Sequence, residues 1–242
     1  MILIATLAST QAFAFYWTDQ FDTSLANWTQ VNTTTPLTFD SGKNAPGSTG
    51  GSAATTMSVS RMYHNLGSDL TGYFKASWYV YDDTITRAFG EMEGRTGGVY
   101  TGALNQIFAA GKYNSVTKTG EVFDATKYQG RLLYPSAGGG WFNLNLPGVP
   151  SRSPGWHKFS VERLVDGTTV NYYVDDILGR TLTGASNVAM NVVVLGFGTT
   201  SSSNGNAWYD NVVVSDVVPE PGSMLALGTG LVGLLGLVRR KR

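Results

Sequence analysis

Short runs of alternating apolar and polar residues are the main pattern in this chain. They cover 73–81, 158–163, 170–174 and 208–214. A period of two residues places one set of side chains on each face of a β-strand, and the Gly, Asn, Asp and Ser clusters between the runs are typical of turns. In the last run, Trp208, Asp210, Val212 and Val214 are predicted to share one face. The pattern predicts an all-β protein whose antiparallel strands form a sandwich or a barrel.

The body of the chain shows no sustained helical pattern, and 103–110 alone could form a short helical turn. Charged residues make up only 14% of the sequence, and there are 30 glycines. Between 15 and 218, 13 Lys and Arg stand against 16 Asp and Glu, a formal charge of −3. This balance lacks the basic face that nucleic-acid binding requires. Because the chain has no cysteine, disulfides and thiolate chemistry are excluded as well.

The end of the chain has an organisation of its own. Pro219, Glu220 and Pro221 precede an uncharged, largely apolar run over 223–238, and the chain closes with Arg239, Arg240, Lys241 and Arg242. At about 1.5 Å per residue, a helix over this run would be roughly 24 Å long, which is short of the ~30 Å hydrocarbon core of a membrane. We therefore predict one short C-terminal hydrophobic helix whose basic end stays in the cytoplasm.

This order of motif, apolar run and basic cluster resembles the PEP-CTERM signals of Gram-negative bacteria. The resemblance implies processing by a membrane-embedded exosortase, with Pro219, Glu220 and Pro221 as the sorting motif. It also implies that the protein is held transiently in the inner membrane through the helix and then reaches the cell surface or the extracellular matrix. An ordinary tail anchor is the alternative.

The beginning of the chain agrees with export. Residues 1–14 are apolar and uncharged and end with Ala12 and Ala14 on either side of Phe13, which is the small-x-small pattern of a signal-peptidase site. The segment is short for a signal peptide and lacks a basic start, so the signal is degenerate or the true start lies upstream. The predicted organisation is a signal peptide at 1–14, a β-sandwich domain at 15–218 and a sorting tail at 219–242.

A second resemblance concerns the body. Asp19, Asp22 and Trp28 lie near its start, followed much later by Trp156-His157 in 155–162, Val174-Asp175-Asp176 after a strand, and Asp210-Asn211 in the final run. This set is similar to concanavalin A-like and laminin G-like jelly rolls. The resemblance implies a two-sheet antiparallel sandwich with adjacent first and last strands. It also implies that His157 forms a hydrogen bond at the start of its strand.

Glu91 and Glu93 are the carboxylate pair that could indicate a glycosidase. Residues two apart on a strand share a face, and the retaining mechanism needs two carboxyl groups about 5–5.5 Å apart. Jelly-roll glycosidases of the laminarinase type carry a longer Glu-x-Asp-x-x-Glu run, whose third acid is missing here. We therefore expect solvent-facing charges at a strand end. No Gly-x-Ser-x-Gly motif indicates a Ser-His-Asp triad, and the histidine spacing does not suggest zinc.

The sequence is consistent with two kinds of binding site, one for calcium and one for sugars. Jelly rolls of this kind often hold a structural calcium ion, and the oxygen ligands that it prefers could come from the first and last strands, namely Asp19, Asp22, Asp210 and Asn211. No other cofactor is expected. Aromatic residues near glycine-rich loops could instead stack on sugars; Tyr128, Arg131 and Trp141 are the main candidates, with Tyr113, Tyr134, Phe142 and Trp156 beside them. Aromatic residues in a sandwich also commonly belong to the core.

Three functions are consistent with the sequence. The first is an exported, exosortase-sorted surface protein that is not an enzyme and associates with extracellular polysaccharide, because exosortase systems usually accompany exopolysaccharide production and the resembled fold commonly binds glycans. The second is a structural or adhesive surface protein with no specific glycan ligand. The third is a divergent glycoside hydrolase or lyase.

Overall fold

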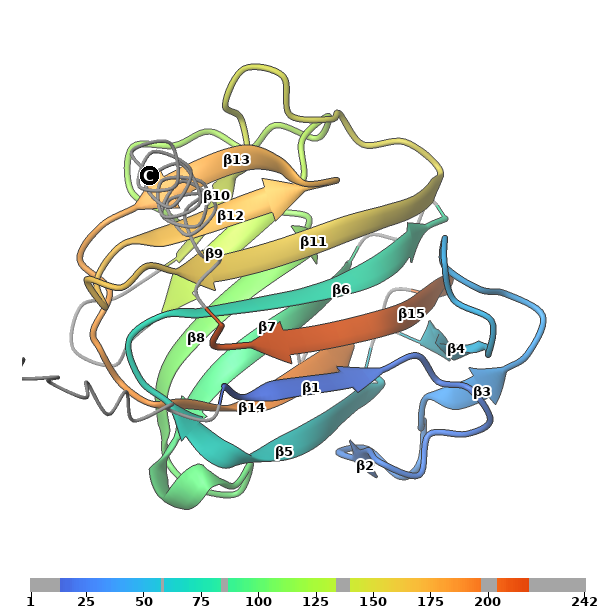
Figure 1. Cartoon of the computed structure of the whole chain (residues 1–242). Helices are drawn as coiled ribbons and strands as arrows, with labels where there is room; N and C mark the ends of the chain where they lie inside the picture. Colours follow the sequence, from blue (N-terminus) through green and yellow to red (C-terminus); the bar gives the residue numbers. More distant parts are fainter. Residues whose placement is uncertain (1–13, 58, 84–86, 134–139, 197–203, 218–242) are drawn as a thin grey trace, which may run out of the picture.

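The computed structural model describes residues 14–57, 59–83, 87–133, 140–196 and 204–217. Within these ranges the chain forms two antiparallel sheets that pack face to face, and most of sheet A lies in front of sheet B in Figure 1. Sheet A has the strand order β13-β12-β11-β6-β15-β4-β3, with β1 also paired to β15. Sheet B has the order β10-β9-β8-β7-β14-β5-β2. The predicted all-β, two-sheet sandwich is therefore confirmed.

The strands are β1 (Tyr16–Asp19), β2 (Thr29–Gln30), β3 (Thr38–Asp40), β4 (Ser52–Met57), β5 (Arg61–Leu70), β6 (Phe74–Asp82), β7 (Ala88–Arg95), β8 (Leu104–Lys112), β9 (Gln129–Leu133), β10 (Gly140–Asn143), β11 (Gly155–Arg163), β12 (Val170–Val174), β13 (Ile177–Leu182), β14 (Met190–Gly196) and β15 (Asn204–Ser215). A single 3₁₀ turn, η1 (Thr96–Gly98), is the only helical element in the described part of the chain. No helix among these residues is long and apolar enough to cross a membrane.

The alternating runs form strands where the sequence predicted them. In β6, β11 and β12, the apolar members of each run point into one large core between the sheets, and the polar members point outward. The β12–β13 hairpin turns through Asp175 and Asp176, whose φ values of 50° and 64° are the left-handed values of a two-residue type I′ turn. The first strand pairs with the last, as β1 runs antiparallel to β15.

A close approach between the sheets fixes the middle of the core. Trp78 of β6 is fully buried and donates its indole N–H to the carbonyl oxygen of Ala110, 3.2 Å away on the opposite sheet. Its ring lies over Gly90 of β7, where a Cβ atom would be 2.5 Å from the indole. Glycine is therefore required at position 90 by contact with Trp78.

Two predictions of local structure are wrong, one in the last strand and one at 103–110. Trp208, Asp210, Val212 and Val214 do not share a face, because the register shifts between Asp210 and Val213, and Asn211 takes the left-handed φ of 48°. Such a bulge inserts one residue and exchanges the faces of a strand. Ala207 and Tyr209 consequently enter the core before the bulge, and Val212 and Val214 after it.

The second error is the helical turn proposed at 103–110. This segment is strand β8, and Ile107, Phe108, Ala109 and Ala110 are all buried within it. The alternation is hidden because both faces of β8 are covered.

Both predicted targeting segments lie largely outside the described residues. Ala12, the sorting motif, the apolar run with its predicted helix, and the basic end all fall there. Ala14 is described and is exposed just before β1. At the other end, the last strand of the sandwich ends at Ser215, directly before the tail.

Candidate functional site

The outer face of sheet B, which points away from sheet A, carries a cluster of buried and half-buried charged residues. In β7 the core takes Ala88 and Met92, so the alternating residues Phe89, Glu91 and Glu93 point outward. A second, smaller hydrophobic cluster on this outer face contains Phe89, Ile107, Ala109 and Trp141. We call this surface the outer face of sheet B.

Strand register lines up the key side chains in one row across sheet B. Glu91 pairs with Ala109, Ala109 pairs with Arg131, and Arg131 pairs with Trp141. The small side chain of Ala109 leaves room for Arg131 to approach Glu91, with 3.8 Å between Nη1 and Oε1. The guanidinium carbon of Arg131 also lies 5.6 Å from the centre of the Trp141 ring.

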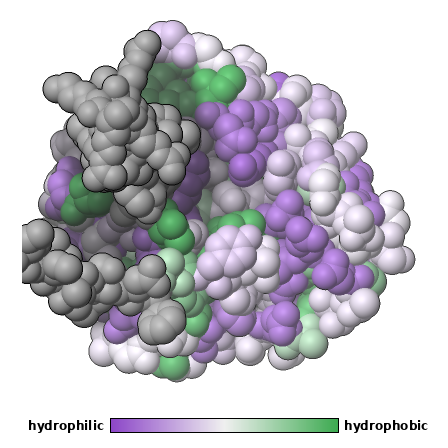
Figure 2. Space-filling view, viewed as in Figure 1, coloured by the Kyte–Doolittle hydropathy of each residue, from purple (hydrophilic) through white to green (hydrophobic). Residues whose placement is uncertain are grey.

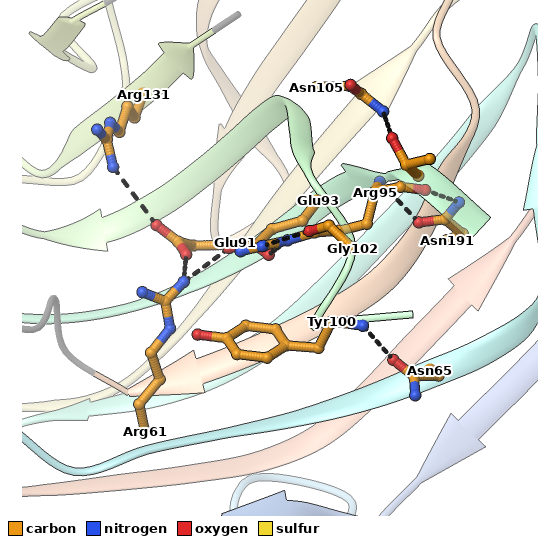
Figure 3. Close-up of polar contacts among 11 residues, drawn as sticks. Arg61, Asn65, Glu91, Glu93, Arg95, Tyr100, Gly102, Asn105, Arg131 and Asn191 are labelled. Carbon is orange, nitrogen blue, oxygen red and sulfur yellow. Dashed lines mark hydrogen bonds and ion pairs between the residues drawn. The ribbon is translucent and has the colours of Figure 1, made fainter. Parts of the chain in front are cut away.

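Glu91 and Glu93 form an ion-pair network with three arginines (Figure 3). Arg61 Nη2, from β5, contacts a carboxylate oxygen of Glu91 and also lies 2.7 Å from Glu93 Oε1. Arg95 Nε donates to Glu93 Oε2 at 2.6 Å. Both carboxylates therefore converge on a single nitrogen of Arg61, and both oxygens of Glu93 accept bonds from guanidinium groups.

Burial controls the electrostatics of this network. Glu91 is 2% exposed and Glu93 is fully buried, so the expectation of solvent-facing charges at a strand end is wrong. β7 is the central strand of sheet B rather than an edge. Burial, reinforced by the negative charge of Glu91, raises the pKa of Glu93 to about 7, although Arg61 and Arg95 act in the opposite direction.

Glu91 and Glu93 do not have the arrangement of the two carboxyl groups of a retaining glycosidase. A retaining glycosidase needs a free nucleophile and a separate acid about 5–5.5 Å apart, both in contact with the sugar. Here the two carboxylates are tied to the same Arg61 nitrogen and neither is open to solvent. The arrangement is instead that of a buried, internally neutralised charge cluster, in which each carboxylate retains its charge partner.

Aromatic pairs lie on either side of the charged centre. Tyr63 of β5 stacks on Tyr100, which follows η1, with ring centres 4.3 Å apart. On the other side Tyr113 stacks on Trp141 with ring centres 4.0 Å apart. Tyr63, Tyr100 and Tyr113 are partly exposed, as is Arg131. These four side chains, together with the less exposed Arg61 and Arg95, form the accessible part of the site.

The predicted sugar-binding residues divide between two environments. Arg131 and Trp141 do come together on the outer face of sheet B, but Trp141 is 4% exposed because Tyr113 covers it. Tyr128 is not on a surface: it is 1% exposed, its ring packs against Phe159, and its hydroxyl contacts Asp82. The proposal that Tyr128 stacks on a sugar is therefore wrong.

The remaining aromatic candidates do not join this site. Phe142 is buried in the main core, and Trp156 lies on the outer face of sheet A, beside Tyr81. Tyr134 lies outside the described residues. The aromatic residues that the sequence reasoning missed, Tyr63 and Tyr100, come from segments with no recognisable motif, and only the fold brings them beside the acids.

The proposed calcium ligands are partly brought together. Asp19 and Asp210 are buried and lie close enough for the charge of Asp19 to act, together with burial, in raising the pKa of Asp210. Their oxygens accept N–H bonds, for example from Trp28 to Asp19 at 3.0 Å and from Ala45 to Asp210 at 2.8 Å. Calcium stays a prediction.

The other two proposed calcium ligands, Asp22 and Asn211, are exposed and half-buried respectively. Within the described ranges, no group of three or more His, Asp or Glu side chains is arranged to hold a metal ion.

Comparison with known proteins separates the tail from the body. Residues 217–242 match the PEP-CTERM protein-sorting motif. No curated protein matches the sequence. The chain therefore ends in a PEP-CTERM sorting motif that follows the sandwich after a single residue, since β15 ends at Ser215.

The body is similar to several solved structures. The cellulose-induced protein Cip1 superposes with a TM-score of 0.55 at 14% identity, over 83% of this chain and 97% of that one. The carbohydrate recognition domain of Emp47p gives 0.51 at 12% identity, over 84% and 95%. A family 16 endo-glucanase from Bacteroides ovatus gives 0.51 at 14% identity, over 82% and 99%. A sialidase gives 0.51 at 10% identity, but this chain spans only 18% of its length.

At these identities the similarity shows the fold alone. The body of this chain is a concanavalin A-like jelly roll, an architecture that these comparisons find in glycoside hydrolases and in a carbohydrate recognition domain.

Proposed function

We propose that this is an exported protein that an exosortase sorts to the cell surface or extracellular matrix of a Gram-negative bacterium, where it associates with extracellular polysaccharide without cleaving it. The observation that carries the proposal is the PEP-CTERM motif at 217–242, directly after a folded jelly roll. A signal peptide at 1–14 and a transient inner-membrane helix complete the route.

Association with polysaccharide is supported by the outer face of sheet B. The rings of Tyr63, Tyr100 and Tyr113 are partly exposed and offer apolar surface with polar edges, which suits sugar rings. Arg95 lies over the Tyr100 ring and Arg87 over the Tyr113 ring, so the guanidinium groups would share in the contact. Arg131 can donate several hydrogen bonds to hydroxyl groups. The similar carbohydrate recognition domain and endo-glucanase support association with polysaccharide only through the shared fold.

The proposal that the polysaccharide is not cleaved rests on the burial and the ion pairs of two carboxylates. Glu91 and Glu93 are buried and bound to arginines, so neither is free to attack a sugar or to protonate a leaving group. The glycosidase alternative would require this network to open. The structural or adhesive alternative is tested by the binding experiment below.

Sorting is tested by changing the motif in cells. Glu220→Ala together with Pro221→Ala should leave a longer species that fractionates with the inner membrane, whereas the wild-type chain should be shortened. Thr229→Ala, inside the apolar run, leaves the motif intact and should be processed like the wild type. If the wild-type chain is recovered full-length, with Arg242 intact and in the same fraction as the motif variant, the chain is a plain tail anchor.

Glycan association is tested by affinity electrophoresis and a glycan array with polysaccharide from the producing cells. Tyr63→Ala and Tyr113→Ala should each weaken binding about tenfold, since the loss of about 1.4 kcal/mol of apolar contact is a factor of ten in affinity. Tyr79→Ala, on the outer face of sheet A, is the matched control and should bind normally. Equal loss in all three variants, or no binding by the wild type, would favour a structural or adhesive role.

A further inference from the structure

A second group of polar side chains lies where the loop before β11 meets the β12–β13 turn. Ser153 Oγ is 3.0 Å from Nε2 of His157, and Nδ1 of His157 is 2.8 Å from Oδ2 of Asp175. The three groups therefore form a chain of hydroxyl, imidazole and carboxylate, in which each ring nitrogen of His157 contacts a different neighbour. This is the arrangement by which a histidine activates a serine, and such triads are recognised by geometry rather than by sequence context.

The fold holds each member in place. His157 is the third residue of β11 and is 8% exposed, with the ring of Tyr128 5.1 Å away. Asp175 occupies the first position of the type I′ turn, and its Oδ1 accepts the backbone N–H of Lys158 at 2.8 Å. One carboxylate oxygen is thus anchored to the backbone while the other orients the imidazole.

Ser153 is the accessible member of the group. It is exposed and lines a pocket of about 220 Å³ together with Lys112 and Arg152. Asp82, Ala125 and Pro154 form the rest of the lining. The pocket is small, so it fits a short acyl group. Lys112 is paired with Asp82, but the guanidinium of Arg152 donates to neutral oxygens, so Arg152 adds positive charge for a carbonyl oxygen that becomes negative during reaction.

We propose that Ser153, His157 and Asp175 form a hydrolytic site for small O-acyl esters, of the kind carried by acylated sugars. Ser153 Oγ attacks the ester carbonyl carbon, and its proton moves to Nε2 of His157. The alcohol leaves with that proton, which gives an acyl-Ser153. Water, deprotonated by His157, then releases the carboxylic acid and restores the serine. This activity is separate from glycan association at sheet B.

The surroundings of His157 set the pH dependence. Burial lowers the pKa of His157, but the hydrogen bond and charge of Asp175, the Ser153 carbonyl and the charge of Asp82 outweigh burial, so the pKa is raised. Tyr128 also faces the ring, and Lys158 lies beside Asp175. Because only the neutral imidazole accepts the serine proton, hydrolysis should increase as the pH rises through this pKa.

The same contacts also describe a purely structural role. Nε2 of His157 lies 3.0 Å from the carbonyl oxygen of Ser153 as well, so a protonated ring could simply tie the loop to the turn. In that role the hydroxyl of Ser153 would not act as a nucleophile. The catalytic and the structural role therefore differ in the nucleophilicity of Ser153, which can be measured directly.

The test uses the full-length protein in detergent, with p-nitrophenyl acetate as substrate and a fluorophosphonate as a covalent probe. The wild type should hydrolyse the ester and take up one probe molecule on Ser153, located by peptide mass mapping, with a rate that increases with pH. Ser153→Ala should lower the rate of hydrolysis at least tenfold and abolish labelling. Asp175→Asn should flatten the dependence of that rate on pH.

Ser151→Ala is the matched control, because Ser151 is an exposed serine on the same loop whose hydroxyl contacts Lys127 instead. It should react like the wild type. Since Ser153 is exposed, its replacement should leave the fold intact, which an unchanged melting temperature would verify. Absence of labelling at Ser153, or equal hydrolysis by Ser153→Ala and the wild type, would overturn the proposal and leave the glycan-binding test unaffected.

Discussion

Replacement of Arg61 by Met tests the ion-pair network of sheet B most sharply. Arg61 is the cation shared by Glu91 and Glu93, and its side chain is 12% exposed while those of the two acids are 2% and 0% exposed. Methionine keeps much of the volume but removes the charge, so two carboxylates remain buried with less compensation. Breaking a buried ion pair in this way typically costs about 3–5 kcal/mol.

We expect the lower end of that range, because Arg95 still binds Glu93 and Arg131 still lies near Glu91. For a domain of this size, about 3 kcal/mol corresponds to a fall in Tm of roughly 6–12 °C at pH 8. The loss should be smaller at pH 5, because protonation of Glu93 removes one of the uncompensated charges. Adding Glu93→Gln to the Met variant should therefore recover part of the stability.

The matched control is Lys158→Met. Lys158 is also a strand cation paired to an acid, but its partner Asp176 is 62% exposed, so the change should cost less than about 1 kcal/mol. Urea or thermal unfolding followed by circular dichroism measures both variants. A loss for Arg61→Met no greater than for Lys158→Met, or equal at pH 5 and pH 8, would refute the account of a buried charge cluster.

Further predictions concern the core, the hairpin, the pH response and calcium. Gly90→Ala should destabilise the fold by about 1–3 kcal/mol in thermal melts, because its Cβ would press on Trp78. Asp176→Gly should raise stability by about 0.5 kcal/mol, since φ there is 64°, and an unchanged or lower Tm would contradict this. Burial raises the folded-state pKa of Glu93 to about 7 from 4.5, so stability should fall as pH rises between these values, and Glu93→Gln should remove that slope. If calcium binds, added Ca²⁺ should raise Tm in the wild type but not in Asp19→Asn.

Local patterns were sufficient to predict the parts of the fold that depend on neighbouring residues. The β12 strand and its turn follow from the alternation before Val174 and from two consecutive aspartates. The bulge in β15 could not be predicted in this way. One inserted residue at Asn211 exchanges the faces of the strand, and nothing in the alternation of the sequence marks the insertion.

The candidate site was predictable only in part. The spacing of Glu91 and Glu93 correctly indicated a shared face, but the sequence does not show that this face is covered. Their main partner, Arg61, is separated from Glu91 by 30 residues, so the neutralising charge appears only when β5 and β7 lie on either side of β14. Similarly, Ser153 and Asp175 meet His157 through a loop and a turn that carry no nucleophile motif.

The intact mass of the mature protein recovered from the producing cells tests the central claim most directly. An exported, exosortase-sorted chain should begin near Phe15 and end near Pro219–Pro221, without the apolar run and the basic cluster. Its mass should therefore be that of the sandwich domain plus any attached group. A recovered chain that still carries Arg242 would contradict the sorting account.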